Sequence, residues 1–297
     1  MIRDRFIAWS RLCLTGLLAA ALVAVFLKGQ SAQHTPQATR RKPAPAANPN
    51  PRDVIPTLEP KAIDLLKETS SRLAAARTMS FTTVVMYESP SRLGPPLAYM
   101  TTSDVTLQRP DKLRVITKAD GPPSEFYYNG KTMTAFSPVE NLVAIASAPP
   151  TIDATLKAAY DEAAIYFPFT DLVVADPYKD INEDGLDNAF YVGQSQVVGG
   201  TTTNIIAYTT GGTFIQMWIG AEDKLPRMMR AVYNQDPSEL RHQLEISNWQ
   251  IDVPVSEGAF APAQAAGAKP IPFAAPEPKV PAGSKLPSKS PPSKPVK

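Results

Sequence analysis

Oxygen-bearing side chains gather in the segment KDINEDGLDN, which spans residues 179–188. Asp180, Asn182 and Asp184 precede Gly185 with the spacing D-x-[DN]-x-[DN]-G that opens a calcium-binding loop. An EF-hand would place a bidentate glutamate at the twelfth position of this loop. This chain has Tyr191 there, and the residues around it have the pattern of a strand. We therefore do not expect a complete EF-hand.

Two interpretations of the segment remain open. Asp180, Asn182 and Asp184, with the help of Asp187, could hold a weakly bound calcium ion in a compact loop. Alternatively, the segment is a plain turn, because Asn, Asp and Gly are favoured in turns for backbone reasons. We expect the turn and keep the three residues as a weak calcium candidate.

Histidine is the other residue type that could support chemistry, and the chain has 2 histidines. His34 lies in a proline-rich stretch, whereas His242 alternates with Leu240, Leu244 and Ile246. This alternation predicts a strand histidine at the edge of a sheet rather than a general base. A zinc site needs three or four Cys, His or carboxylate ligands, and the middle of the chain has one histidine and no cysteine. The sequence also contains no nucleophile elbow and no phosphate-binding glycine motif. We therefore expect no enzyme, no cofactor and no resident metal.

Composition divides the chain into a globular middle and two extended ends. Of the 31 prolines in 297 residues, seven fall in residues 33–60 and ten in residues 261–297. The net charge of +2 gives no reason to expect a nucleic-acid partner. The remaining middle is long enough to bury a core, and it contains no cysteine, so packing alone must hold it.

Residues 1–32 have the order of a targeting segment. Three arginines precede an apolar run from Leu12 to Leu27, which fits a cleaved signal peptide or an uncleaved membrane anchor. Cys13 stands before most of this run, so it does not occupy a lipoprotein cleavage position. Both alternatives export the protein through the inner membrane, and we predict a periplasmic location.

The expected domains follow from these boundaries. Residues 33–57 are predicted to be a Pro/Ala-rich linker, residues 58–262 the folded domain, and residues 263–297 a disordered Pro/Lys-rich tail. The tail is expected to be solvated. The alternative is a basic arm that touches an anionic envelope or membrane surface.

Within the domain, the hydrophobic period predicts a helix, several strands, a second helix and further strands. Apolar residues at helical spacing predict helices over residues 59–80 and 151–167. Between and after them the period is two, and Asn129-Gly130 is a strong hairpin signal. Short turns joining neighbouring strands favour an antiparallel meander. The fold class is therefore α+β, with a curved antiparallel sheet and helices over one face.

The ordered set of residues in this meander resembles the LolA/LolB-like outer-membrane lipoprotein carrier superfamily. The resemblance is strongest to a branch of predicted periplasmic proteins of unknown function, and it covers roughly residues 60–262. The matching residues are Pro110, Leu113, Arg114, Val115, Tyr127, Tyr128, Gly130, Lys131, Thr132, Phe136, Pro138, Gly199, Gly200, Gln216, Trp218, Ile219, Leu225, Pro226, Arg227 and Trp249. Where that branch often has Cys and His, this chain has Thr203, Asn204 and Ile205.

This resemblance implies a half-barrel whose concave face is covered by helices, with an apolar cavity between the two. The implied function is a carrier for a hydrophobic ligand, either a lipid or a lipoprotein acyl chain, that works by binding without chemistry. Six apolar or aromatic residues are the candidates for the cavity wall, although each would serve equally well in a plain core: Phe126, Tyr128, Phe214, Trp218, Met229 and Ile246. The alternative is a cell-envelope interaction scaffold that works through its proline-rich tails.

Overall fold

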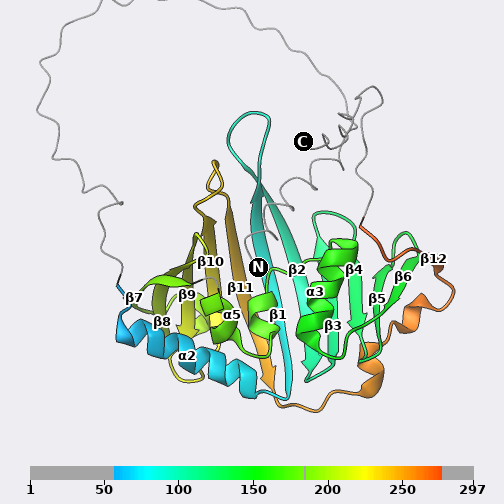
Figure 1. Cartoon of the computed structure of the whole chain (residues 1–297), viewed down its shortest axis with the longest axis horizontal. Coiled ribbons are helices and arrows are strands. Elements are labelled where there is room, and N and C mark those ends of the chain that lie inside the picture. The colour runs from blue at the N-terminus through cyan, green and yellow to red at the C-terminus, as the bar shows by residue number, and fades with distance from the viewer. Residues whose placement is uncertain (1–56, 184, 276–297) are drawn as a thin grey trace, which may run out of the picture.

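The structure, a computed structural model of the chain, describes residues 57–183 and 185–275 (Figure 1). The expected targeting segment at 1–32 lies outside the described residues, and so does all of the expected linker except residue 57. Residues 276–297 of the expected tail also lie outside them. The fold described below is therefore that of the globular middle of the chain.

Two antiparallel meanders join into one sheet of 12 strands within the described residues. The first meander contains β1 Thr78–Ser89, β2 Leu97–Gln108, β3 Lys112–Ala119, β4 Ser124–Tyr128, β5 Thr132–Ser137 and β6 Leu142–Ser147. The second contains β7 Leu186–Ser195, β8 Thr203–Thr210, β9 Thr213–Gly220, β10 Pro226–Tyr233 and β11 Arg241–Ile251. The last strand is β12 Lys269–Ile271.

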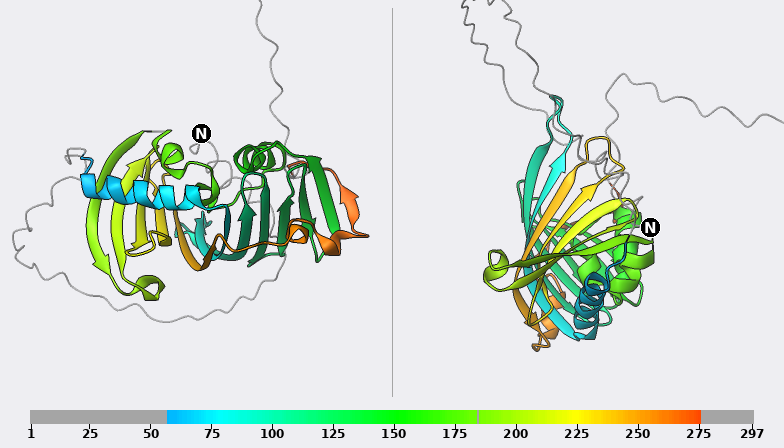
Figure 2. Two further views of the ribbon diagram at one scale, coloured as in Figure 1. Left: turned by 90° about the horizontal axis from the view of Figure 1, so that it is seen from below. Right: turned by 90° about the vertical axis from the view of Figure 1, so that its left-hand side faces the viewer.

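The two meanders meet in the middle of the sheet, where β1 pairs with β11. The strand order is β12-β6-β5-β4-β3-β2-β1-β11-β10-β9-β8-β7. The register places Val85 of β1 opposite Leu244 of β11. Figure 2 shows that the sheet curls into an open half-barrel. The predicted α+β class and the curved antiparallel sheet are confirmed.

Four α-helices of the described residues lie on the concave side of the sheet (Figures 1 and 2). They are α2 Pro60–Ala75, α3 Ile152–Ala163, α4 Thr170–Val173 and α5 Pro177–Glu183. Helix α3 lies over the half that contains β3 and β4, whereas α2 and α5 lie over the half that contains β7 to β11 (Figure 1). Three short 3-10 turns complete the described elements: η3 Val198–Gly200, η4 Glu257–Phe260 and η5 Ala263–Ala265.

Helix α2 shows how local signals and tertiary contacts together set a helix boundary. Pro60 occupies the first helical turn, as expected, because proline needs no intrahelical donor there. The residue at the N-cap is Glu59, and the helix begins no earlier. The reason is that the preceding residues are extended and pair with the edge strand: Leu58 forms a parallel bridge to Ala189. The Glu59 amide also donates to the Ala189 carbonyl oxygen at 2.8 Å.

The core lies between the concave face of the sheet and the helices. In β1 the burial alternates from Thr78 to Val85, with Met79, Phe81 and Val85 almost fully buried. From the helix side, Leu66 and Leu73 of α2 are each 1% exposed. Burying each such side chain contributes about 2 kcal/mol to stability. Packing therefore replaces the disulfides that this part of the chain lacks.

The predicted Asn129-Gly130 hairpin is present between β4 and β5. The Asn129 side chain accepts from the backbone amides of Lys131 and Thr132 at 3.0 and 2.9 Å. Gly130 has a φ of 89°, in the region that favours glycine. Its position is also crowded, because a Cβ there would lie 2.6 Å from an Asp111 carboxylate oxygen.

The domain extends further than the sequence suggested. The expected boundary was residue 262, but β12 pairs in parallel with β6 and adds a strand at the edge of the first meander. Phe273 packs against the core, and the amide of Ala275 donates to the Glu162 carbonyl oxygen at 2.8 Å. A three-residue strand has too few positions to show a period of two, and this one has Pro270 in its middle, so the sequence did not indicate it.

Candidate functional site

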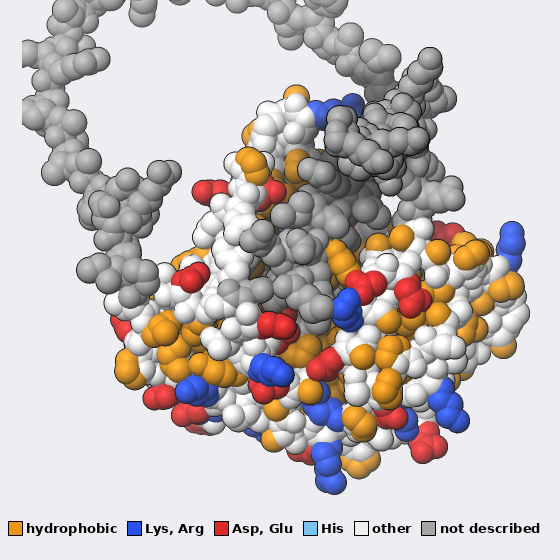
Figure 3. Space-filling view, in the orientation of Figure 1, with side chains coloured by type: hydrophobic (Ala, Val, Ile, Leu, Met, Phe, Trp, Pro, Cys, Tyr) orange, Lys and Arg blue, Asp and Glu red, His pale blue; other side chains and the backbone are white. Residues whose placement is uncertain are grey.

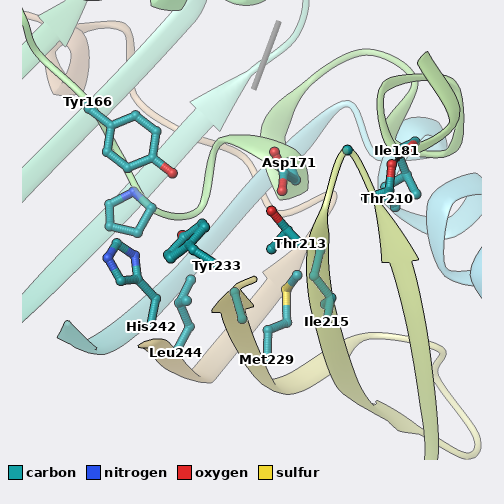
Figure 4. A pocket seen from close by; sticks show the side chains of 13 residues that line it. Tyr166, Asp171, Ile181, Thr210, Thr213, Ile215, Met229, Tyr233, His242 and Leu244 are labelled. Carbon is teal, nitrogen blue, oxygen red and sulfur yellow. Dashed lines mark hydrogen bonds between the residues drawn. The ribbon is translucent and has the colours of Figure 1, made fainter. Parts of the chain in front are cut away.

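A pocket lies between the sheet and the segment that carries α4 and α5 (Figure 4). Its sheet side is formed by β9, β10 and β11, and its deeper wall is apolar, with Ile215, Met229 and Leu244. Ile181 of α5 adds an apolar side chain from the helix layer. The enclosed volume is about 50 Å³. The pocket is therefore a mostly apolar void between two layers of the fold.

The other side of the pocket is polar. Tyr166 and Asp171 contribute from the segment around α4, and Tyr233 and His242 from β10 and β11. In Figure 4, Tyr166 and His242 lie together at one end, and Ile181 lies with Thr210 at the other. The strand order agrees with this arrangement, because β11 and β8 are on opposite sides of β9 and β10. The pocket thus has an amphipathic lining.

His242 belongs to this polar side and is only 6% exposed. Burial lowers its pKa from the usual 6.5 to about 4, because a charged imidazolium would lose its hydration. Its ring contacts Tyr233 edge to face at a centroid distance of 5.1 Å and Tyr87 at 5.9 Å. At neutral pH the imidazole is therefore uncharged.

Tyr99, Tyr87, His242 and Tyr233 form an aromatic row across four neighbouring strands. Tyr87 stacks on Tyr99 at 5.7 Å, and the row continues through the two contacts of His242. The four residues lie on β2, β1, β11 and β10, which are adjacent in the sheet. Tyrosines combine an apolar ring with a polar tip. The row therefore presents an amphipathic border beside the pocket.

Asp171 places a negative charge close to the tyrosines of this region. Burial is the first cause that raises the pKa of Tyr208 and Tyr233, and the charge of Asp171 raises both further. Tyr208 is 1% exposed. The field of Asp171 therefore reaches into the space between the sheet and the helices.

The α4 segment is attached to the sheet by Arg109, which follows β2. Its guanidinium donates to the carbonyl oxygens of Val173 and Val174 at 3.0 and 2.9 Å and, more weakly, to that of Leu73 at 3.4 Å. Burial lowers the pKa of Arg109, and the nearby Asp153 opposes this shift. One side chain thus joins the C-terminal ends of α2 and α4.

A second, smaller void of about 10 Å³ lies beneath α2 and shares Asp171, Ile181 and Met229 with the pocket. Thr69 of α2 faces this void, and its hydroxyl has no hydrogen-bond partner among the described residues. An unsatisfied buried hydroxyl costs about 1–3 kcal/mol. The two voids together mark a poorly packed seam between the sheet and the helices α2, α4 and α5.

The six residues expected to form a cavity wall separate into three groups. Met229 lines the pocket. Phe126, Tyr128 and Ile246 are buried in the core on the same, concave face of the sheet.

Phe214 and Trp218 lie on the opposite face of β9, so they do not belong to the expected wall. The concave face of this strand carries Ile215, Met217 and Ile219 instead. Both alternating sets of β9 are rich in apolar residues, so the sequence alone could not say which face points inward.

The expected position of His242 also needs correction. It was predicted at the edge of the sheet, but β11 lies at its centre, between β1 and β10. His242 stands opposite Tyr87 on one side and Ala231 on the other. The alternation is visible in the sequence but the strand order is not, so the sequence did not indicate that His242, Tyr233 and Asp171 line one pocket.

The weak calcium candidate falls partly within a helix. Asp180 and Asn182 belong to α5, where residues two apart point to different sides of the helix. Asp184 lies outside the described residues. Within residues 57–183 and 185–275, no three His, Cys, Asp or Glu side chains form a group suited to a metal ion. The expected turn does follow, since Gly185 has a φ of 83° just before β7.

In the part of the chain that the structure describes, no helix combines the length and the apolar run that crossing a bilayer requires. The family model described as "Predicted periplasmic protein (DUF2092)" matches residues 62–274. Comparison with curated proteins found no match.

Several solved structures are similar to the chain at low identity. The Mycobacterium tuberculosis lipoprotein LppX is 13% identical, with 67% of this chain and 99% of that chain covered and a TM-score of 0.42. A LolA superfamily protein from Nitrosomonas europaea is 10% identical, with 68% and 97% covered and a TM-score of 0.30. A chain of the Pseudomonas aeruginosa MucA/MucB complex is 14% identical, with 69% and 62% covered and a TM-score of 0.39. This protein thus spans less than two thirds of the length of that last chain.

Proposed function

Because the chain belongs to the family of predicted periplasmic proteins DUF2092, we propose that it is an exported binding protein that carries a hydrophobic ligand. The ligand class is a lipid or a lipoprotein acyl chain, and the mechanism is binding without chemistry. The family match confirms the resemblance to this branch of periplasmic proteins. The observation that carries the proposal is the amphipathic pocket between the half-barrel and its helices.

The volume of the pocket bears on the mechanism. Ligand pockets typically measure about 300–1,000 Å³, whereas this pocket encloses about 50 Å³. A lipid chain therefore needs more room than the described conformation provides. We propose that this conformation is the closed, ligand-free state, and that the helices move away from the sheet when a chain enters.

The seam between sheet and helices is where such a movement would cost least. Dispersion contacts are already missing around the two voids. The unsatisfied hydroxyl of Thr69 would regain hydrogen bonds with water on opening. Helices α4 and α5 are also short, so few contacts hold each of them in place.

Figure 3 shows hydrophobic side chains on the same face of the molecule as these helices, interspersed with both acidic and basic residues. Scattered apolar side chains are normal on a protein surface. The proposal therefore rests on the internal pocket and not on this face.

The test is mass spectrometry of the lipids that accompany the full-length chain, recovered from bacterial periplasm without detergent. We expect a stoichiometric lipid. In Ala231→Leu, which fills the pocket from β10, we expect clearly less lipid. Val232→Phe is the matched control, because its side chain lies on the opposite face of the same strand.

The proposal fails if the wild-type chain is folded but carries no lipid. It also fails if Ala231→Leu and Val232→Phe retain the same amount of lipid as the wild type. Thermal unfolding of each variant separates loss of binding from loss of the fold.

The alternative of an envelope scaffold depends on tail residues that lie outside the described part of the chain. Since residues 263–275 are part of the fold, a tail deletion has to begin at residue 276. Removal of residues 276–297 would favour the scaffold if envelope association were lost while the lipid content stayed unchanged.

A further inference from the structure

One hydroxyl in the seam between the helices and the sheet is buried without a hydrogen-bond partner. Thr69 of α2 is 3% exposed, and its hydroxyl has no partner among the described residues. A threonine inside a helix can satisfy this group by donating to the carbonyl oxygen four residues earlier, which here belongs to Leu65. Thr69 does not make this bond. A partner for its hydroxyl therefore has to come from a bound molecule.

Thr69 faces a space that is small and mostly apolar. It lines the void of about 10 Å³ beneath α2. The apolar part of the lining includes Leu66 and Met217. Ser70 and Asp171 are its other polar residues. A buried water needs at least about 10–15 Å³ and two to four polar partners, so this void is at the lower limit of what one water requires.

The void continues the pocket described above. Ile181 and Met229 line both spaces. Ile181 lies at the end of the pocket that is away from Tyr166 and His242 (Figure 4). Methionine has three rotatable bonds and adapts to its surroundings, so a change in the Met229 side chain can join the two spaces. An acyl chain that enters the pocket and extends past Met229 would thus reach Thr69.

The chemistry of such a chain matters at this point, because the chain keeps water away from the hydroxyl. An unsubstituted hydrocarbon offers neither a donor nor an acceptor, so the hydroxyl would stay unsatisfied in the complex. A chain with a hydroxyl or another uncharged oxygen at this depth can share a hydrogen bond with Thr69, since a threonine hydroxyl both donates and accepts. A site with a buried polar group disfavours the analogue that leaves this group unpaired.

We propose that Thr69 determines the specificity of an oxygen subsite, through which the protein prefers amphiphiles whose acyl chain carries a hydroxyl or another uncharged oxygen over amphiphiles with an unsubstituted chain. This inference rests on the proposed carrier function and narrows its ligand class. The subsite recognises the chain of the ligand and not its headgroup.

Thr83 of β1 provides a matched comparison within the same chain. It is 0% exposed, and its hydroxyl also has no hydrogen-bond partner in the described part of the chain. Unlike Thr69, it lines neither the pocket nor the smaller void. Thr83→Val therefore removes a buried hydroxyl of the same kind at a position outside the path proposed for the ligand.

The experiment uses the full-length chain, freed of bound lipid, and monoacylglycerol probes of equal chain length. One probe has an unsubstituted chain, and the others carry one hydroxyl near the ester, in the middle of the chain or at its far end. Titration calorimetry measures the affinities. We expect one hydroxylated probe to bind at least about fivefold more tightly than the unsubstituted probe.

The variants test whether this preference comes from Thr69. Thr69→Val keeps the shape of the side chain and should reverse the preference, because the hydroxyl of the probe would then be buried without a partner. Thr83→Val should keep the wild-type preference. Thermal unfolding checks the fold of each variant. Thr69→Ala removes the same hydroxyl and replaces Thr69→Val if that variant unfolds, since alanine suits a helix interior.

The outcomes separate the two proposals. If no probe binds to the wild type, the carrier function itself is overturned, and the oxygen subsite with it. If all probes bind equally, or the unsubstituted probe binds best, the carrier function stands and the oxygen subsite is overturned. The subsite is also overturned if the variant without the Thr69 hydroxyl keeps the wild-type preference, or if Thr83→Val loses it.

Discussion

Helix α3 covers the first half of the sheet, and α4 and α5 cover the second, yet the two halves are fastened differently. Thr151 caps α3 through a hydrogen bond from the Ala154 amide at 3.3 Å. The Ile152 amide donates to the Pro110 carbonyl oxygen at 3.0 Å, and the Tyr128 hydroxyl donates to that of Pro149 at 2.6 Å. Two of these contacts thus tie the start of α3 to the sheet, one at the turn between β2 and β3 and one from Tyr128 of β4.

The second half is also fastened by polar contacts, since the Thr210 hydroxyl of β8 donates to the Ile181 carbonyl oxygen of α5 at 2.6 Å. Arg109 holds the C-terminal end of α4, and two voids lie between the helices and the sheet. The two halves therefore differ in how closely the helices pack on the sheet. The half under α2, α4 and α5 contains the two voids, and it is there that the opening proposed above would cost least.

The largest expected loss of stability compares buried side chains in the two halves of the sheet. Leu113→Ala removes a fully buried side chain under α3, and we expect a loss of about 3–5 kcal/mol in the free energy of unfolding. Ile215→Ala lies at the pocket, where contacts are already missing, and should cost about 2 kcal/mol. Urea unfolding of the lipid-free chain measures both. Equal losses would remove the distinction between a dense half and a loose half.

The next prediction concerns the pH dependence of stability that His242, a residue of the pocket, should cause. The pKa of His242 is about 4 in the folded chain and about 6.5 when unfolded. Between these values the unfolded chain binds a proton that the folded chain does not, so stability falls as the pH falls. From pH 7 to pH 4 this residue alone should lower the free energy of unfolding by about 3 kcal/mol.

His242→Gln provides the test, because glutamine does not titrate in this range. The variant should lose less stability than the wild type between pH 7 and pH 4, by roughly the 3 kcal/mol expected of the histidine. Urea titrations at the two pH values give the difference. Wild-type and variant curves that remain parallel would show that the imidazole is accessible to water and not sealed into the sheet.

The smallest loss of stability is expected for a substitution on the convex face. Phe214 is half-buried on the side of β9 away from the helices. Phe214→Ala should lower the free energy of unfolding by less than about 1 kcal/mol, which is well below the losses expected in the core. Its lipid content should equal that of the wild type. A strong loss of bound lipid in this variant would mean that the convex face takes part in binding.

The sequence predicted those features that local signals determine. Asn129-Gly130 specifies its own turn, and Pro60 with its apolar period specifies α2. Features that depend on distant partners were not predictable in the same way. The centre of the sheet, which places His242 beside Tyr87, depends on a pairing between β1 and β11. The inward face of β9 depends on which of two apolar sets meets the helices.

The polar side of the pocket was missed for the same reason. Asp171, Tyr233 and His242 come from three separate elements, and none of them stands in a recognisable motif. A weak signal existed in the polar residues of otherwise apolar strands, because a buried histidine or tyrosine usually has a partner. That signal identifies neither the partner nor the space between them.

The pairing of β1 with β11 also has a consequence for the timing of folding. The register joins Val85 to Leu244, and β12 returns to pair with β6 at the edge of the first meander. Contacts between such distant positions slow the folding of a chain. The half-barrel can be completed only after residue 271 is available to pair with β6. The chain therefore acquires its curvature late, when both meanders are present together.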